Sequence, residues 1–124
     1  MQKANKPASK KQKGRRLEQW ISRELRSSGA DENAKVMPGS GAFTHFKGDI
    51  YTKLGWHIEA KNQETAKVWE WWEQARSQAG IQKRPVVIFS RNHSEPKALL
   101  DARDFIALVA EVELLWEDLQ KKRK

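Results

Sequence analysis

Apolar residues recur at intervals of three and four along three segments of the chain, which is the spacing of one face of an α-helix. The first such stripe consists of Leu17, Trp20, Ile21 and Leu25. The pattern predicts helices over residues 15–27, 65–79 and 102–122. Gly80 is placed to end the second helix, and Asp101 is placed to cap the start of the third.

Short β-prone segments fill much of the remaining chain. They cover residues 42–46, 48–52, 56–61 and 85–90. Residues 53–55 make a connection of hairpin length, so we expect two or three antiparallel strands before the second helix. The continuous apolar run in 85–90 is typical of a strand buried on both faces. The chain therefore predicts an α/β fold, a small mixed β-sheet flanked by helices in the order α-β-β-β-α-β-α.

Six tryptophans are many for a chain of this length. Aromatic side chains bury large areas in small domains, so we expect Trp69 and Trp72 in the core. Trp71 and Trp116 are left open as residues of a dimer interface, where aromatic residues are enriched.

The length of 124 residues suits one domain. We expect a basic unstructured arm over 1–14, a single domain over 15–120 and a basic tail over 121–124. The absence of cysteine excludes a disulfide scaffold and thiol catalysis. No apolar run reaches the length of a membrane span, so we expect a cytoplasmic protein with no membrane partner.

The net charge of +8 is concentrated at the ends of the chain. Residues 1–16 carry seven basic residues and no acidic one, and the last four residues are all basic. The remaining body holds 13 basic and 16 acidic residues. Basic arms on such a body are typical of proteins that bind polyphosphates, although a solvated tail that only aids solubility has the same composition.

The segment from Asp49 to Lys61 carries the candidate chemistry. Glu59 and Lys61 are two residues apart on a predicted strand, so both project from one face, and Asp49 lies on the neighbouring strand. Two carboxylates and the backbone carbonyl of Ala60 suit Mg²⁺ or Mn²⁺, and the lysine suits the charge that develops on a phosphate. Taken alone, the motif is equally compatible with an ordinary charge pattern on a solvated sheet.

The wider pattern resembles the PD-(D/E)XK nuclease superfamily, and within it the archaeal and phage Holliday junction resolvases. The matching elements are Lys13-Gly14 with Glu18, Gly39-Ser40-Gly41, Asp49, and Glu59-Ala60-Lys61, all in the family's order. The resemblance covers about residues 13–90. The chain departs from the pattern at Gly48, where the superfamily name has proline, and in detail over 62–72.

This resemblance implies a restriction-endonuclease-like core and a metal-dependent endonuclease that resolves four-way DNA junctions. It makes Asp49 and Glu59 metal ligands, Lys61 the catalytic lysine, Glu18 a further acidic residue of the site, and Ser40 a loop residue near the scissile phosphate. An exposed helix charge is the alternative for Glu18. We expect Mg²⁺ or Mn²⁺, two ions per site, and no small-molecule cofactor. Because symmetric cutting needs two sites, the resemblance also implies a homodimer, of phage, bacterial or archaeal source.

Contacts to branched double-stranded DNA are expected from basic side chains that bind phosphates rather than bases. They are Lys10, Lys11, Lys13, Arg15, Arg16, Lys47 and Arg91. His45, His57 and His93 lack metal-ligand spacing and are expected at the surface or in loops. The alternatives are another PD-(D/E)XK endonuclease of repair or restriction type, and a non-catalytic basic DNA-binding protein.

Overall fold

The computed structural model describes residues 10–37 and 50–123, and the statements below concern these residues. The elements are α1 (Lys10–Ser27), β1 (Lys35–Val36), β2 (Ile50–Tyr51), β3 (Trp56–Asn62), α2 (Val68–Ala79), β4 (Arg84–Ser90), β5 (Lys97–Leu100) and α3 (Ala102–Lys122). Among these helices, none combines the length and the apolar character that a membrane-spanning segment requires.

The central sheet has the order β3-β4-β5 and is mixed, as predicted. β3 and β4 are parallel, with Trp56 opposite Arg84 and Asn62 opposite Ser90, and α2 forms the connection between them. β5 runs antiparallel to β4 and was not predicted. The expected pairing of residues 48–52 with β3 is also wrong for the described part of the chain, where β2 pairs with β1. The segment 42–46 lies outside the described residues.

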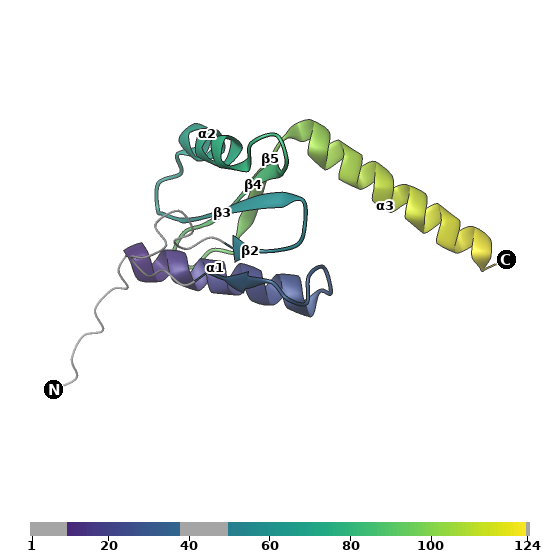
Figure 1. The fold of residues 1–124 in the computed structure, drawn as a ribbon, viewed down its shortest axis with the longest axis horizontal. Helices are drawn as coiled ribbons and strands as arrows, with labels where there is room; N and C mark the ends of the chain where they lie inside the picture. The colour runs from purple at the N-terminus through teal and green to yellow at the C-terminus, as the bar shows by residue number, and fades with distance from the viewer. Residues whose placement is uncertain (1–9, 38–49, 124) are drawn as a thin grey trace.

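The two faces of the sheet are covered by different helices (Figure 1). On one face, Leu17 and Ile21 of α1 form a buried cluster with Ile58 and Val86. On the other face, Trp71 and Ala75 of α2 pack against Val87. Adjacent residues Val86 and Val87 point to opposite faces, so β4 is buried on both sides, which confirms the prediction from its continuous apolar run.

One helix begins earlier than predicted, and another matches its predicted bounds. α1 begins at Lys10, so the assignment of residues 10–14 to an unstructured arm is wrong. Tertiary contact explains the difference, because the Lys13 carbonyl accepts a hydrogen bond from Asn62 Nδ2 at 3.4 Å and ties the first turns of α1 to the end of β3. α3 spans Ala102–Lys122, as predicted, and so includes the first two residues of the predicted basic tail.

The tryptophans of α2 differ from the prediction mainly at Trp69, which was expected in the core. Trp71 is buried, Trp72 is half-buried and Trp69 is 79% exposed. The helix begins at Val68 instead of residue 65, and its buried face runs through Trp71, Ala75 and Ala79 at intervals of four. Trp71 then packs at 5.7 Å, centroid to centroid, against Phe89 of β4. The helical spacing of the apolar residues alone was compatible with burial of either face of α2.

α3 projects away from the body of the molecule (Figure 1). The helix is described along its whole length and has no buried residue. Its start is fixed as predicted, because the Asp101 carboxylate caps it by accepting a hydrogen bond from the Arg103 N–H at 2.9 Å.

Candidate functional site

β3 carries the Glu-x-Lys motif at the centre of the candidate site. Its side chains alternate between the two faces, with Ile58 toward α1 and Glu59 on the α2 side. Glu59 is buried and Lys61 is half-buried. Within the described residues, no carboxylate forms an ion pair with the Lys61 ammonium.

A histidine on the same face holds the Glu59 carboxylate. His57 Nε2 lies 2.9 Å from Glu59 Oε1 and 3.1 Å from Gln78 Oε1 of α2. Both partner atoms are oxygen acceptors, so the tautomer with a proton on Nε2 suits both contacts. The expectation of a surface or loop position for His57 is wrong. The spacing of two residues between His57 and Glu59 could have predicted their contact, because it places both side chains on one face of the strand. The contact with Gln78 depends on how α2 is rotated over the sheet.

The backbone of β3 presents the Ala60 carbonyl to the sheet edge that β4 does not use. Gly55 O accepts a hydrogen bond from Arg84 N at 2.9 Å, and Gln63 N donates to Ser90 O at 3.1 Å. Backbone polar groups of alternate residues point to opposite edges of a strand. The odd-numbered residues therefore face β4, and Ala60 faces the other edge, where the described sheet has no further strand. An oxygen available at this edge, beside Glu59, fits the oxygen shell that Mg²⁺ or Mn²⁺ requires.

Of the other predicted site residues, one lies on α1 and the rest lie outside the described chain. Glu18 is half-buried on α1, the helix that covers the opposite face of β3 from Gln78. The described residues contain no group of three or more acidic, histidine or cysteine side chains able to hold a metal ion. Asp49, Ser40 and Lys47 are outside the described residues.

A basic cleft lies at the carboxyl ends of β3 and β4, next to the Glu-x-Lys motif. It has a volume of about 350 Å³. Its lining is Lys13, Arg16, Asn62, Ser90, Arg91, Asn92, His93 and Ser94. Three residues predicted to bind DNA, two on α1 and one after β4, thus meet in one cleft although they are far apart in sequence. The remaining predicted contacts on α1 are Lys10 in its first turn and the exposed Lys11 and Arg15.

The turn that follows β4 shapes one wall of this cleft. His93 adopts a left-handed backbone with a φ of 59°. Ser94 N donates to Arg91 O at 3.2 Å, and the Ser90 hydroxyl donates to Ser94 O at 2.9 Å. Glu64 accepts the Asn92 N–H at 2.8 Å, which fixes the turn to the end of β3. The turn therefore holds Arg91 close to the carboxyl end of the Glu-x-Lys strand.

A mixed sheet between two helices, a Glu-x-Lys strand and a basic cleft at its end are the features expected of a nuclease of the PD-(D/E)XK superfamily. The model of one family matches residues 9–123, and its description is "Phage putative PDDEXK endonuclease". The chain belongs to this family, so its substrate class is DNA, and divalent metal ions are typical of its superfamily. No curated protein and no solved structure gives a significant match to the chain.

Proposed function

We propose that this protein is a metal-dependent, structure-selective endonuclease that resolves four-way DNA junctions as a homodimer. The observation that carries the proposal is the position of Glu59 and Lys61 on a strand that ends in the basic cleft of Lys13, Arg16 and Arg91. The order of the other motif residues along the chain, which resembles junction resolvases, supports the choice of substrate.

The metal would be held by Asp49, Glu59 and the Ala60 carbonyl, with Glu18 as a further acidic residue. We propose Mg²⁺ or Mn²⁺, with two ions per site. When bound, such ions polarise a phosphodiester and lower the pKa of a coordinated water. His57 and Gln78 would keep the Glu59 carboxylate in one orientation, since His57 Nε2 bridges Glu59 Oε1 and Gln78 Oε1.

Lys61 would act on the reacting phosphate itself. Its half-buried ammonium has no acidic partner within the described chain, so it can stabilise the negative charge that develops as water attacks phosphorus and the P–O bond to the leaving strand breaks. Ser40, between two glycines, would approach the scissile phosphate from its loop. The basic side chains of the cleft would bind phosphates of the DNA backbone and not base edges. Such contacts suit an enzyme that recognises the shape of DNA more than its sequence.

The test is cleavage of a labelled synthetic four-way junction, beside a linear duplex of the same sequence, with Mg²⁺ and with EDTA. We expect paired symmetric nicks in the junction only, dependent on the metal. Asp49→Asn and Glu59→Gln should each lower the cleavage rate by a factor on the order of 100 or more and leave junction binding intact, because they remove metal ligands and no phosphate contact. The matched control is Glu70→Gln, the same change at an exposed position of α2.

Each alternative result has a defined meaning. Equal cutting of junction and duplex would keep the nuclease and reject the junction specificity, in favour of another PD-(D/E)XK endonuclease. Binding without cutting in any divalent metal, unaffected by Asp49→Asn, would favour a non-catalytic DNA-binding protein.

A further inference from the structure

We propose that α3 is the homodimer interface and that it pairs in parallel with α3 of a second copy as a short two-stranded coiled coil. The inference deepens the proposed function, because it supplies the second active site that symmetric junction cutting needs. It rests on the apolar stripe of α3, and it can be tested without DNA or metal.

The start of α3 is fixed in a direction that leaves this stripe uncovered. Only Asp101 separates β5 from α3, and its side chain caps the helix. Asp104 Oδ1 lies 3.9 Å from Arg84 Nε of β4, which adds a second tie to the sheet. These two contacts orient the start of α3, and the described part of the chain leaves its apolar face uncovered. A second copy of the chain is the partner that we propose for this face.

Five apolar residues of α3 follow a heptad repeat, and the exposed Ile106 and Leu114 lie outside it. With Phe105 as position a, the a positions continue with Val112 and Leu119, and the d positions are Leu108 and Leu115. Val112 is 61% exposed and Leu115 is 63% exposed. Within parallel coiled coils, a β-branched residue at a with leucine at d favours two strands over three or four. A second copy of this helix has the same repeat, so each apolar a or d residue packs against the same residue of the other helix.

The charges beside this seam favour the parallel orientation. Glu111 and Asp118 occupy consecutive g positions, which face each other in an antiparallel pair and would repel. In a parallel pair, each g position faces the following e position of the other helix. Asp118 then meets the Arg123 side chain of the second copy, an attractive pair. The neighbouring e positions, Val109 and Trp116, widen the apolar seam and are 44% and 55% exposed.

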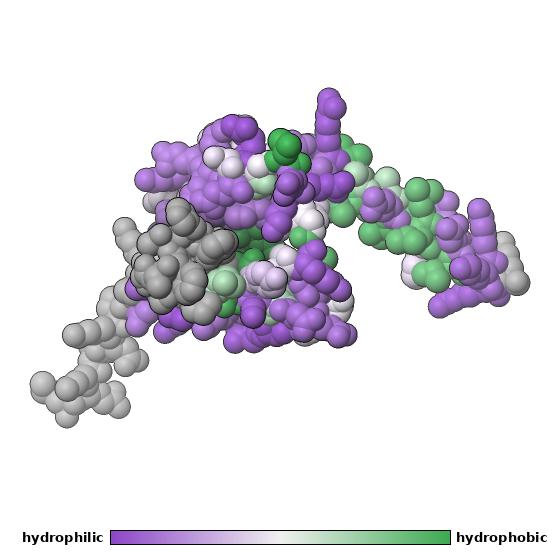
Figure 2. All heavy atoms as spheres, in the orientation of Figure 1, coloured by the Kyte–Doolittle hydropathy of each residue, from purple (hydrophilic) through white to green (hydrophobic). Residues whose placement is uncertain are grey.

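The apolar surface continues from α3 onto the body. A pocket of about 290 Å³ at the N-terminal end of α3 has a mainly apolar lining. Its lining is Val68, Trp69, Trp72, Leu99, Leu100, Asp101 and Ala102. Figure 2 shows hydrophobic residues along the part of α3 nearest the body, ahead of its hydrophilic end. In a parallel pair, the N-terminal ends of the two α3 helices lie together, and both bodies lie at that end of the coiled coil.

The experiment measures the mass of the full chain by sedimentation velocity over a range of concentrations. We expect a concentration-dependent species of twice the 14.4 kDa chain mass. The double variant Val112→Lys/Leu115→Lys puts charge into the seam and should weaken dimerisation by a factor on the order of ten or more. Ala107→Lys/Ala110→Lys adds the same charge at exposed positions of the outer face and should leave the dimer unchanged. Circular dichroism verifies that both variants keep their helix.

The relative orientation of the two α3 helices is tested by disulfide cross-linking. The chain has no cysteine, so a single introduced cysteine can form a disulfide only with its copy in the second chain. Lys122→Cys, at the last d position, should form an intermolecular disulfide on oxidation in a parallel pair, whereas an antiparallel pair puts these residues at opposite ends. A monomer at every concentration, or equal effects of the two lysine pairs, would overturn the proposed interface. A dimer without this cross-link would overturn the parallel orientation. Loss of junction cutting with an intact dimer would count against the proposed function alone.

Discussion

At the scale of single residues, Asp31 shows how one buried carboxylate connects two parts of the chain. It is buried and accepts hydrogen bonds from Thr52 Oγ1 at 2.6 Å, Lys53 N at 2.9 Å and Asn33 N at 3.0 Å. These bonds tie the turn after α1 to the residues that follow β2. The hydrogen bond from Thr52, followed by that from Lys53, lowers the pKa of Asp31 below its ordinary value of 3.8.

This lowered pKa makes stability depend on pH in a defined direction. The folded protein binds the Asp31 proton less tightly than the unfolded chain does, so the carboxylate adds stability above the unfolded pKa of about 3.9. That stability is lost as the pH falls through the lower folded pKa. We expect Asp31→Asn to reduce the free energy of unfolding at pH 7, with the difference from wild type shrinking toward pH 3. Urea denaturation across this range measures both effects.

The neighbouring acid provides the control for Asp31. Glu32 is exposed, so Glu32→Gln should leave the unfolding free energy nearly unchanged at both pH values. A difference for Asp31→Asn that stays constant from pH 7 to pH 3 would show that the carboxylate charge is not what stabilises the turn.

At the scale of elements, α1 contains a glycine that its backbone does not require. Gly14 lies within the helix, and a Cβ added there would meet only Glu18 Oε1, at 3.9 Å, an ordinary contact. Alanine costs less conformational entropy than glycine inside a helix. We expect Gly14→Ala to stabilise the protein by about 0.5–1 kcal/mol, measured as an increase in the free energy of unfolding in urea.

Gly80, at the end of α2, should respond in the opposite direction. It has open space around it but a φ of 64° and a ψ of −149°, a conformation open almost only to glycine. Gly80→Ala should therefore destabilise by about 1–3 kcal/mol. Equal signs for the two substitutions would mean that backbone conformation does not decide the outcome at these positions.

Local patterns predicted those elements whose signals lie within their own segment. The stripe from Leu17 to Leu25, the buried run of β4 and the Asp101 cap are of this kind. β5 has only three apolar residues after Pro96, and it exists because β4 offers an edge to pair with. The choice of Trp71 over Trp69 depends on the angle at which α2 meets the sheet, which spacing does not encode.

The candidate site also combines features that local sequence patterns predict with features that depend on tertiary packing. The period of two along a strand predicted that Glu59 and Lys61 share a face, and the contact of His57 with Glu59 follows the same period. The contact of His57 with Gln78 and the meeting of Arg91 with α1 depend on tertiary packing. The convergence of Asp49 with Glu59 stays a prediction.

At the scale of the whole molecule, the basic charge at the start of α1 works against the helix. The first turn has three lysines and no acidic residue, and two arginines follow it, although the positive end of the helix dipole favours acids there. This arrangement lowers helix stability, and it places Lys13 and Arg16 in the cleft with Arg91. A ligand with negative charge would offset the repulsion, which accords with a DNA backbone as the substrate.

The cleft charges can be counted by the salt dependence of DNA binding. Removing one protein–phosphate interaction reduces the slope of log K against log salt by about 0.9 on duplex DNA. Replacing Lys13, Arg16 and Arg91 by alanine should therefore lower the magnitude of the slope by up to about 2.7. Deleting residues 1–9 removes only Lys3 and Lys6 and should lower it by at most about 1.8. Fluorescence anisotropy in EDTA measures both slopes without cleavage.

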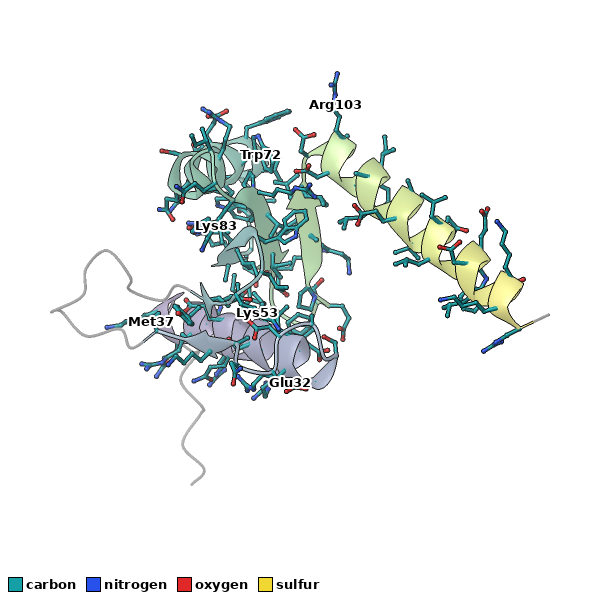
Figure 3. All side chains as sticks on the ribbon, turned by 45° about the vertical axis from the view of Figure 1, so that its right-hand side comes forward. Glu32, Met37, Lys53, Trp72, Lys83 and Arg103 are labelled. Atoms are coloured by element: carbon teal, nitrogen blue, oxygen red, sulfur yellow. The ribbon has the colours of Figure 1, made fainter. Side chains whose placement is uncertain are left out.

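Three other basic side chains give the matched control. Lys53, Lys83 and Arg103 are exposed and come from separate parts of the chain outside the cleft (Figure 3). Their triple alanine variant changes the net charge equally, so it tests whether position or total charge governs binding. An unchanged slope for this control, beside a reduced slope for the cleft variant, would locate the DNA backbone at the carboxyl ends of β3 and β4. Equal reductions would mean that diffuse positive charge alone attracts the DNA, and the cleft would lose its assigned role.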